Sequence, residues 1–206
     1  MITQTQDLQA EMTPDRALEM LKQGNERFVN RNMTDRDLME QVDITGKGQY
    51  PFATVLHCID SRVSAELIFD QGIGDLFSVR IAGNFVNEDI LGSMEFATKL
   101  AGTKVLMVLG HTHCGAVKGA CDHVEMGNLT SMLSKITPIV DQVEQEFDEK
   151  GSSNPELVQK VAELNVHQAL SDIRTKSPII REMEEKRELK LVGGMYDINT
   201  GKVTFY

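Results

Sequence analysis

The sequence KVLMVLG at residues 104–110 decides the fold. It is almost continuously apolar, which is typical of a parallel β-strand covered on both faces. Two similar runs lie upstream at residues 52–59 and 76–82, and helical patterns at 64–71 and 89–101 separate the three runs. Strands that alternate with helices indicate βαβ units. We therefore predict an α/β fold with a mostly parallel, wound β-sheet flanked by helices.

The N-terminal part of the chain predicts a helical arm. Thr13 is suited to cap a helix and Pro14 to its first turn, and apolar residues continue on one face to about residue 30. Residues 31–48 are polar and mixed in charge, so we expect a loop there or an arm that orders only against a partner. We predict a single domain, 1–206, with an N-terminal helical arm at 1–48 and an α/β core at 49–206.

The second half is mostly helical in pattern. Apolar residues keep a helical spacing over 132–147, where Pro138 predicts a kink. Asn154-Pro155 and Ser177-Pro178 each indicate a helix cap followed by a first-turn proline. Residues 189–206 contain two apolar runs around the turn sequence NTG, which predicts a C-terminal β-hairpin at a sheet edge.

Composition excludes several classes of partner. The chain has 21 basic and 31 acidic residues, a net charge of −10, which argues against binding to nucleic acid or anionic lipid. Its apolar runs are far shorter than the ~20 residues that span a bilayer, and the polar N-terminus does not resemble a secretion signal. Three cysteines, an odd number, indicate thiols or metal ligands rather than a disulfide framework. We expect a cytoplasmic protein.

Side chains that can coordinate a metal ion follow two of the predicted strands. Cys58 lies at the end of the first apolar run, and His111 and Cys114 follow the third. Ligands of wound α/β sheets bind beyond the carboxyl ends of strands, so these three side chains are expected to meet. Two thiolates and an imidazole suit zinc, and three protein ligands are typical of a catalytic site that keeps a position for water. The alternative is a pair of buried thiols with no metal.

Two motifs carry a resemblance to a known family. CIDSRV at residues 58–63, followed by GHTHCGAVK at 110–118, resembles the β-class carbonic anhydrases, in particular their bacterial, plant-like type I branch. The similarity extends over residues 71–84, the helix around SMEFA at 93–97 and the closing hairpin at Tyr196-Asp197. The absence of tryptophan from the chain favours the branch in which the metal keeps an open position.

The resemblance implies a reaction and its catalytic residues. Cys58, His111 and Cys114 would bind one Zn²⁺ per chain, and hydroxide on the metal would convert carbon dioxide reversibly to bicarbonate and a proton. Asp60 would accept a hydrogen bond from that hydroxide, and Arg62 would hold Asp60 ionised in a bidentate pair. An ordinary surface ion pair is the alternative interpretation of Asp60 and Arg62.

The resemblance also implies substrate-binding residues. Gln49 corresponds to a glutamine that reaches bicarbonate from the partner subunit, although by sequence alone it is a loop residue. Phe77, Ala82 and Phe96 occupy pocket-lining positions, with core packing as their alternative role, and Phe96 replaces a tyrosine common in the family. Gly115, directly after the last ligand, is the fifth predicted substrate-binding residue. The family relationship further implies a homodimer or a dimer of dimers.

The remaining histidines and the third cysteine are assigned to other roles. His57 should point away from Cys58 and pack in the core. His113, between two ligands, is a candidate proton relay, with a surface position as its alternative. His123 and His167 are predicted at the surface or on a helix, and Cys121 is predicted to be a buried free thiol.

Three rival functions remain open from the sequence. The same zinc site could hydrolyse carbon disulfide or carbonyl sulfide. A non-catalytic zinc-binding interaction domain would have its metal closed by Asp60, although Arg62 argues against that arrangement. A redox pair of Cys114 and Cys121 is disfavoured because their spacing exceeds that of thiol oxidoreductases.

Overall fold

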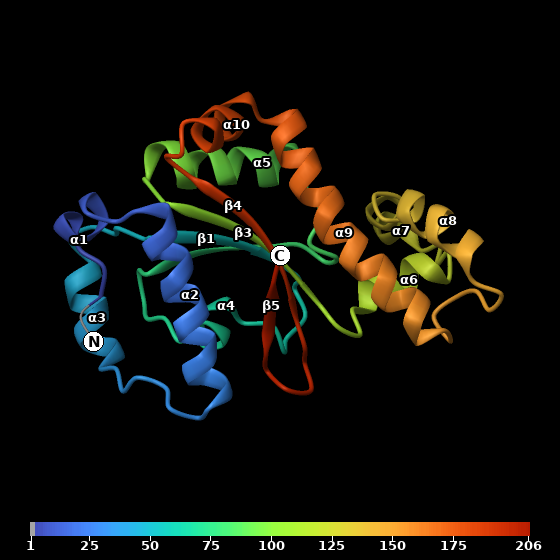
Figure 1. Ribbon diagram of the computed structural model, residues 1–206, viewed down its shortest axis with the longest axis horizontal. Coiled ribbons are helices and arrows are strands. Elements are labelled where there is room, and N and C mark those ends of the chain that lie inside the picture. The colour runs from blue at the N-terminus through green and yellow to red at the C-terminus, as the bar shows by residue number, and fades with distance from the viewer. Residues whose placement is uncertain (1–2) are drawn as a thin grey trace.

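A five-stranded sheet forms the centre of the computed structural model, which describes residues 3–206 (Figure 1). Its strand order is β2-β1-β3-β4-β5. The strands are β1 (Ala53–His57), β2 (Leu76–Arg80), β3 (Val105–His111), β4 (Lys190–Tyr196) and β5 (Val203–Phe205). The first four are parallel, whereas β5 pairs antiparallel with β4 at the edge. The predicted α/β class, the parallel sheet and the C-terminal edge hairpin are confirmed.

Each face of the sheet is covered by its own hydrophobic core. Along β3, Val105, Met107 and Leu109 join the core on the side of α2, whereas Leu106 and Val108 join the larger core on the other side. Successive side chains of a strand point to opposite faces, so a strand buried on both sides needs an apolar residue at almost every position. This double burial explains the continuous apolar run from which the strand was predicted.

Helices on both sides supply these cores (Figure 1). Those in the first half are α1 (Gln6–Ala10), α2 (Pro14–Val29), α3 (Leu38–Thr45), α4 (Ala65–Ile68) and α5 (Glu88–Glu95), which continues as a π-helical turn, η1 (Phe96–Leu100). Those in the second half are α6 (Gly115–Cys121), α7 (Gly127–Leu133), α8 (Thr137–Val143) with a 3₁₀ turn η2 (Glu144–Glu146), α9 (Pro155–Lys176) and α10 (Pro178–Glu185). Within residues 3–206, no helix is both long and apolar enough to cross a membrane.

Three predicted helix starts are confirmed, and one predicted kink is wrong. The side chains of Thr13, Asn154 and Ser177 each accept a backbone hydrogen bond at the first turn of α2, α9 and α10. Pro138 does not kink one continuous helix. It lies in the first turn of α8, a separate helix, where a missing N–H leaves no helical hydrogen bond unmade.

The expectation of a loop over residues 31–48 is wrong for α3. Asp37 caps this helix by accepting hydrogen bonds from the backbone N–H groups of Met39 and Glu40. The segment before α3 is ordered by contacts within the same chain. Its anchor is the Asp70 cluster, in which the buried Asp70 carboxylate accepts hydrogen bonds from three side chains: Arg27, Thr34 and Arg36. A carboxylate far along the chain thus orders a segment whose own sequence is polar.

Candidate metal centre

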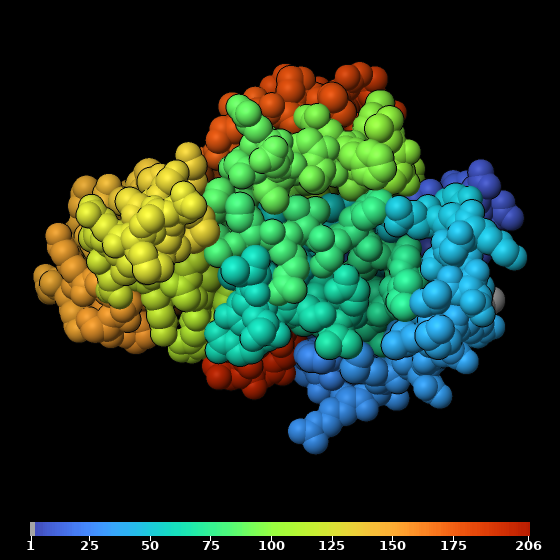
Figure 2. Space-filling model, turned by 180° about the vertical axis from the view of Figure 1, so that it is seen from behind, coloured from blue at the N-terminus to red at the C-terminus, as the bar shows by residue number. Residues whose placement is uncertain are grey.

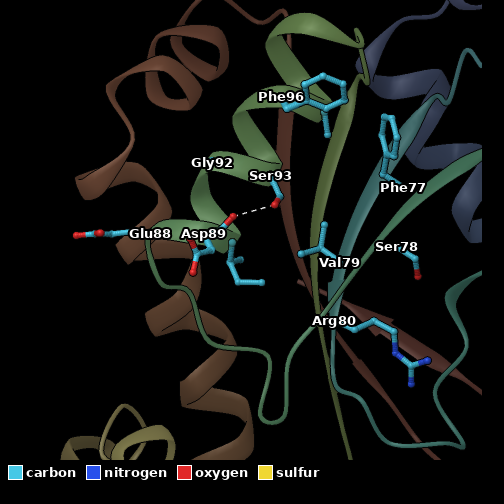
Figure 3. Close-up of a pocket in the computed structure, with 11 residues that line it drawn as sticks. Phe77, Ser78, Val79, Arg80, Glu88, Asp89, Gly92, Ser93 and Phe96 are labelled. Atoms are coloured by element: carbon cyan, nitrogen blue, oxygen red, sulfur yellow. Dashed lines mark hydrogen bonds between the residues drawn. The ribbon is translucent and has the colours of Figure 1, made fainter.

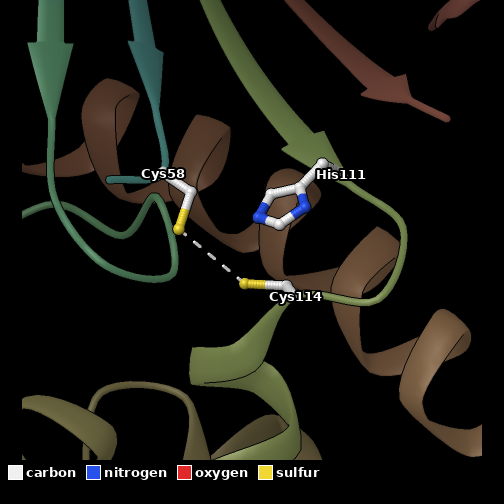
Figure 4. A group of neighbouring side chains, drawn as sticks. All are labelled: Cys58, His111 and Cys114. Atoms are coloured by element: carbon white, nitrogen blue, oxygen red, sulfur yellow. Dashed lines mark hydrogen bonds between the residues drawn. The ribbon is translucent and has the colours of Figure 1, made fainter. Parts of the chain in front are cut away.

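The carboxyl ends of two neighbouring strands bring the predicted ligands together (Figure 4). In the β1–β3 ladder, His57 lies opposite Leu109, so the residue after β1, Cys58, comes close to His111 at the end of β3. A short turn then places Cys114 at the start of α6. The ligand atoms of Cys58, His111 and Cys114 all lie within 4.8 Å of one another, and all three residues are buried. We call these three residues the metal cluster.

The metal cluster has the properties of an incomplete ligand set. The two sulfur atoms are 3.9 Å apart. The Nδ1 atom of His111 is hydrogen-bonded to the carbonyl oxygen of Thr112 at 3.0 Å, whereas its buried Nε2 atom has no hydrogen-bond partner among residues 3–206. A buried polar atom without a partner is costly, and coordination to a metal ion would satisfy it. Two thiols and one imidazole are donors that suit zinc.

The two thiols of the cluster influence each other's ionisation. The contact with the Cys114 thiol, followed by a hydrogen bond from the backbone N–H of Gly83, lowers the pKa of the Cys58 thiol well below its usual range. The pKa of Cys114 is raised, because its proton is held by the neighbouring Cys58 sulfur and because the thiol is buried. The opposite shifts of the two thiol pKa values arise from the same contact between the two sulfur atoms. A cation bound to both sulfur atoms would require both thiols to lose their protons.

Asp60 and Arg62 form a bidentate pair beside the cluster. Arg62 donates from Nε to Oδ1 at 2.9 Å and from Nη2 to Oδ2 at 2.7 Å, and its backbone N–H also donates to Oδ1. These hydrogen bonds hold the pKa of Asp60 well below its usual range. The Oδ2 atom of Asp60 lies 4.0 Å from the unpartnered Nε2 of His111. An ionised acceptor is thus fixed at the edge of the metal cluster.

Arg80, at the end of β2, was not identified from the sequence. Its Nε donates to the carbonyl oxygen of Cys58 at 3.2 Å, and its Nη2 donates to that of Asp60 at 3.0 Å. One guanidinium group therefore holds the backbone on both sides of Ile59, between the metal ligand and the carboxylate. The only sequence signal for this contact is a charged residue within an apolar strand run.

A cavity of about 280 Å³ adjoins the cluster. Cys58 and Asp60 line one side of it, and Ala82 and Gly115, both predicted as substrate-binding residues, also contribute to its lining. Ile59 also lines the cavity, and the remaining residues come from α6 and α7, so that the lining is predominantly apolar. The site thus combines three metal-type donors, a fixed carboxylate and an apolar cavity.

Comparison with known proteins agrees with this arrangement. The family model described as carbonic anhydrase matches residues 53–203, which include the four parallel strands and the metal cluster. The chain belongs to the β-carbonic anhydrase family.

Relatives in this family match over most of their length. Carbonic anhydrase 2 of Mycobacterium tuberculosis is 33% identical over 190 residues, covering 92% of this chain and 91% of the relative. Among solved β-carbonic anhydrases, CafA of Aspergillus fumigatus superimposes with a TM-score of 0.74 at 26% identity, covering 93% and 89% of the two chains. A tetrameric enzyme of Sordaria macrospora has a TM-score of 0.73 at 25% identity, covering 79% and 84%.

Three residues at family pocket positions do not line the cavity of this single chain. Phe77 and Phe96 face each other across a separate groove between β2 and α5 (Figure 3), with ring centroids 6.3 Å apart in an edge-to-face arrangement. Gln49 is exposed in the segment before β1. The structure therefore brings Ala82 and Gly115 to the carbonic anhydrase site but leaves Gln49, Phe77 and Phe96 outside it.

Four of the remaining residues lie where the sequence predicts: His57, His123, His167 and Cys121. His57 is fully buried and hydrogen-bonded to the Ser78 hydroxyl at 2.7 Å, and burial lowers its pKa to about 4. It takes no part in the metal cluster. The side chains of three further histidines are exposed: His113, His123 and His167. Cys121 is a buried free thiol behind the cluster.

Proposed function

We propose that this protein catalyses the reversible hydration of carbon dioxide to bicarbonate and a proton, with one zinc ion per chain held by Cys58, His111 and Cys114. One observation carries the proposal: the buried Nε2 of His111 lacks a hydrogen-bond partner among the described residues and lies 4.0 Å from the Asp60 carboxylate, in a residue whose ligand atom lies within 4.8 Å of two cysteine sulfur atoms. Membership of the β-carbonic anhydrase family supports the same reaction.

When bound, zinc supplies a Lewis acid that lowers the pKa of water enough to make hydroxide available near neutral pH. Asp60 accepts a hydrogen bond from the nucleophile and so directs its lone pair toward the substrate carbon. This role requires an ionised carboxylate, and the bidentate pair with Arg62 keeps Asp60 ionised and turned away from a ligand position. Arg80 fixes the backbone on which Asp60 is carried.

We further propose that the active enzyme is a homodimer or a dimer of dimers in which the partner contributes to substrate binding. Gln49, Phe77 and Phe96 lie outside the cavity of their own chain, and Phe96 is 52% exposed. A partner subunit that supplied these side chains would complete the apolar wall and add an amide donor for bicarbonate. The relative from Sordaria macrospora is tetrameric.

The branch of the family and the cellular compartment are part of this proposal. The formed Asp60–Arg62 pair supports the plant-like type I branch, in which the metal keeps a position for the nucleophile. All three cysteines are free thiols, which supports a reducing compartment such as the cytoplasm.

Stopped-flow measurement of carbon dioxide hydration tests the reaction. The zinc-loaded protein should exceed the buffer rate at a pH of about 8.5, where hydroxide is plentiful. Removal of the metal by a chelator should abolish the activity, and added zinc should restore it. A protein that holds one zinc per chain and still fails to accelerate hydration would contradict the proposal.

A further inference from the structure

Part of the apolar side of the cavity is built by α7, to which the two family motifs assign no role. Apart from residues 58–60 and Ala82, the cavity is lined by residues of α6 and α7, which belong to the lobe to one side of the sheet (Figures 1 and 2). A cavity of about 280 Å³ has room for roughly nine water molecules at ~30 Å³ each. It therefore admits a three-atom substrate without rearrangement.

Small residues of α6 create this space. Ala116 and Gly119 line the cavity from the helix that begins directly after the last metal ligand. A Cβ atom at Gly119 would lie 3.4 Å from Cδ1 of Leu133, which is ordinary van der Waals contact, so Leu133 of α7 packs directly against this position of α6. At Gly115 a Cβ atom would meet nothing within 4 Å among the described residues, since this position faces open space. The floor of the cavity is thus a row of residues with little or no side chain.

Leu129 and Met132 of α7 face this floor. They are three residues apart and therefore lie on the same side of the helix. Both are partly buried and line the cavity, whereas Leu133 is only 3% exposed and anchors α7 in the main core. The start of the helix is fixed by a hydrogen bond from the backbone N–H of Met126 to the Thr130 hydroxyl at 2.7 Å. The two side chains thus line the same cavity as Asp60 from a helix secured at both ends.

An apolar wall in this position suits the proposed substrate. Carbon dioxide has no net dipole, so dispersion contacts and the release of water are the main forces that can hold it. Bicarbonate, the charged product, gains nothing from thioether and alkyl groups and leaves for water. The wall therefore favours the apolar reactant over the ionic product beside the carboxylate.

We propose that Leu129 and Met132 are specificity-determining residues, which form the outer wall of the carbon dioxide cavity and restrict it to small, linear, apolar molecules. The inference rests on the proposed function for the identity of the substrate. According to this proposal, α7 of the same chain forms part of the substrate site. The motifs that contain the metal ligands, Asp60 and Arg62 do not include this helix.

Nitrous oxide tests the wall without any turnover, because it is linear and isoelectronic with carbon dioxide. The zinc-loaded protein, labelled with ¹³C at its methionine methyl groups, would be followed by NMR under increasing nitrous oxide pressure. The Met132 methyl resonance should shift in a saturable way. Met126, directly before the same helix but 65% exposed and not part of the cavity lining, is the internal control and should not shift. Equal responses of the two methyl groups would overturn the proposal.

Kinetics of matched variants provide the second test. Met132→Ala should raise KM for carbon dioxide about fivefold, the effect of losing roughly 1 kcal/mol of contact, with kcat and zinc content retained. Met126→Ala should match the wild type. Met132→Gln nearly conserves the volume of the side chain but makes it polar, so it should also raise KM for carbon dioxide. This variant provides the test if Met132→Ala does not fold. Wild-type KM values in Met132→Gln and Met132→Ala would overturn the proposal. A wild-type protein that binds nitrous oxide at Met132 but does not hydrate carbon dioxide would instead contradict the proposed function alone.

Discussion

Two buried clusters of polar side chains join distant parts of this chain, and they differ in where an unpartnered atom remains. In the Asp70 cluster it is Nε of Arg36, on a guanidinium whose other two nitrogens are bonded to Asp70, whereas in the metal cluster it is an imidazole nitrogen that can bind a metal. In the Asp70 cluster, both carboxylate oxygens accept hydrogen bonds from the chain itself. In the metal cluster, the Nε2 atom of His111 has no partner among residues 3–206, and the sulfur atoms of Cys58 and Cys114 mainly contact each other. A cluster whose acceptors are satisfied stabilises the fold, whereas an unsatisfied one is built for a ligand. Substitutions in the two clusters should therefore have different consequences.

Removal of a metal ligand should have the largest effect. Cys58→Ser replaces a thiolate with a poor zinc ligand, so the purified protein should lose most of its zinc and its hydration activity. Inductively coupled plasma mass spectrometry measures the zinc content per chain. Cys121→Ser is the matched control, since Cys121 is a buried thiol outside the cluster, and it should keep one zinc per chain. A Cys58→Ser protein with full zinc content would remove Cys58 from the ligand set.

Neutralising the carboxylate beside the metal cluster should separate activity from metal binding. Asp60→Asn keeps the shape of the side chain but removes the charged acceptor, so kcat/KM should fall by about 100-fold or more with zinc retained. Asp148→Asn, at an exposed position, should behave as the wild type. Stopped-flow kinetics and metal analysis on the same samples decide the outcome. Full turnover by Asp60→Asn would exclude the proposed role of Asp60.

The Asp70 cluster should respond in the opposite way. Asp70 is fully buried and paired with two arginines, so Asp70→Asn should cost about 3 kcal/mol in the free energy of unfolding. Zinc content and hydration activity of the folded variant should be unchanged. Urea unfolding measures the loss, and Asp172→Asn, which breaks a surface pair with Lys176, should cost less than about 1 kcal/mol. An Asp70→Asn protein that lost its zinc but kept its stability would contradict the assignment of the Asp70 cluster to the stability of the fold.

The contribution of the Asp70 cluster to the free energy of unfolding should also depend on pH, although this effect is smaller. Burial alone would raise the pKa of Asp70, but hydrogen bonds from Arg36 and Arg27 outweigh it, and the pKa in the folded protein is lowered. A lowered folded-state pKa gives stability that is present above the usual aspartate pKa of about 4 and is lost as pH falls through the folded value. The stability difference between wild type and Asp70→Asn should therefore shrink on acidification. A difference that grew below that pH would contradict this assignment.

The sheet and the metal cluster were predictable because their signals are local. A strand buried on both faces needs a continuous apolar run, and parallel strands place the residues that follow them at one edge. Cys58 and His111 lie at two such ends, so their convergence followed from sequence alone. The motifs around them then indicated Asp60 and Arg62, which the structure places in a bidentate pair.

The features that were missed depend on contacts between distant residues. The order of the segment before α3 comes from Asp70, and the backbone at Asp60 is held by Arg80 from another strand. Similarly, Leu129 and Met132 follow an ordinary helical spacing, and only the packing of α7 on α6 shows that they face the cavity. No pattern within a single segment carries such information.

X-ray absorption at the zinc edge is the decisive experiment for the metal cluster, because it counts the sulfur atoms around the bound metal. We predict two sulfur neighbours at about 2.3 Å in the wild type and in Cys121→Ser, and one sulfur in any zinc that Cys58→Ser retains. A zinc shell without sulfur, or a shell unchanged by Cys58→Ser, would contradict the assignment of the metal cluster.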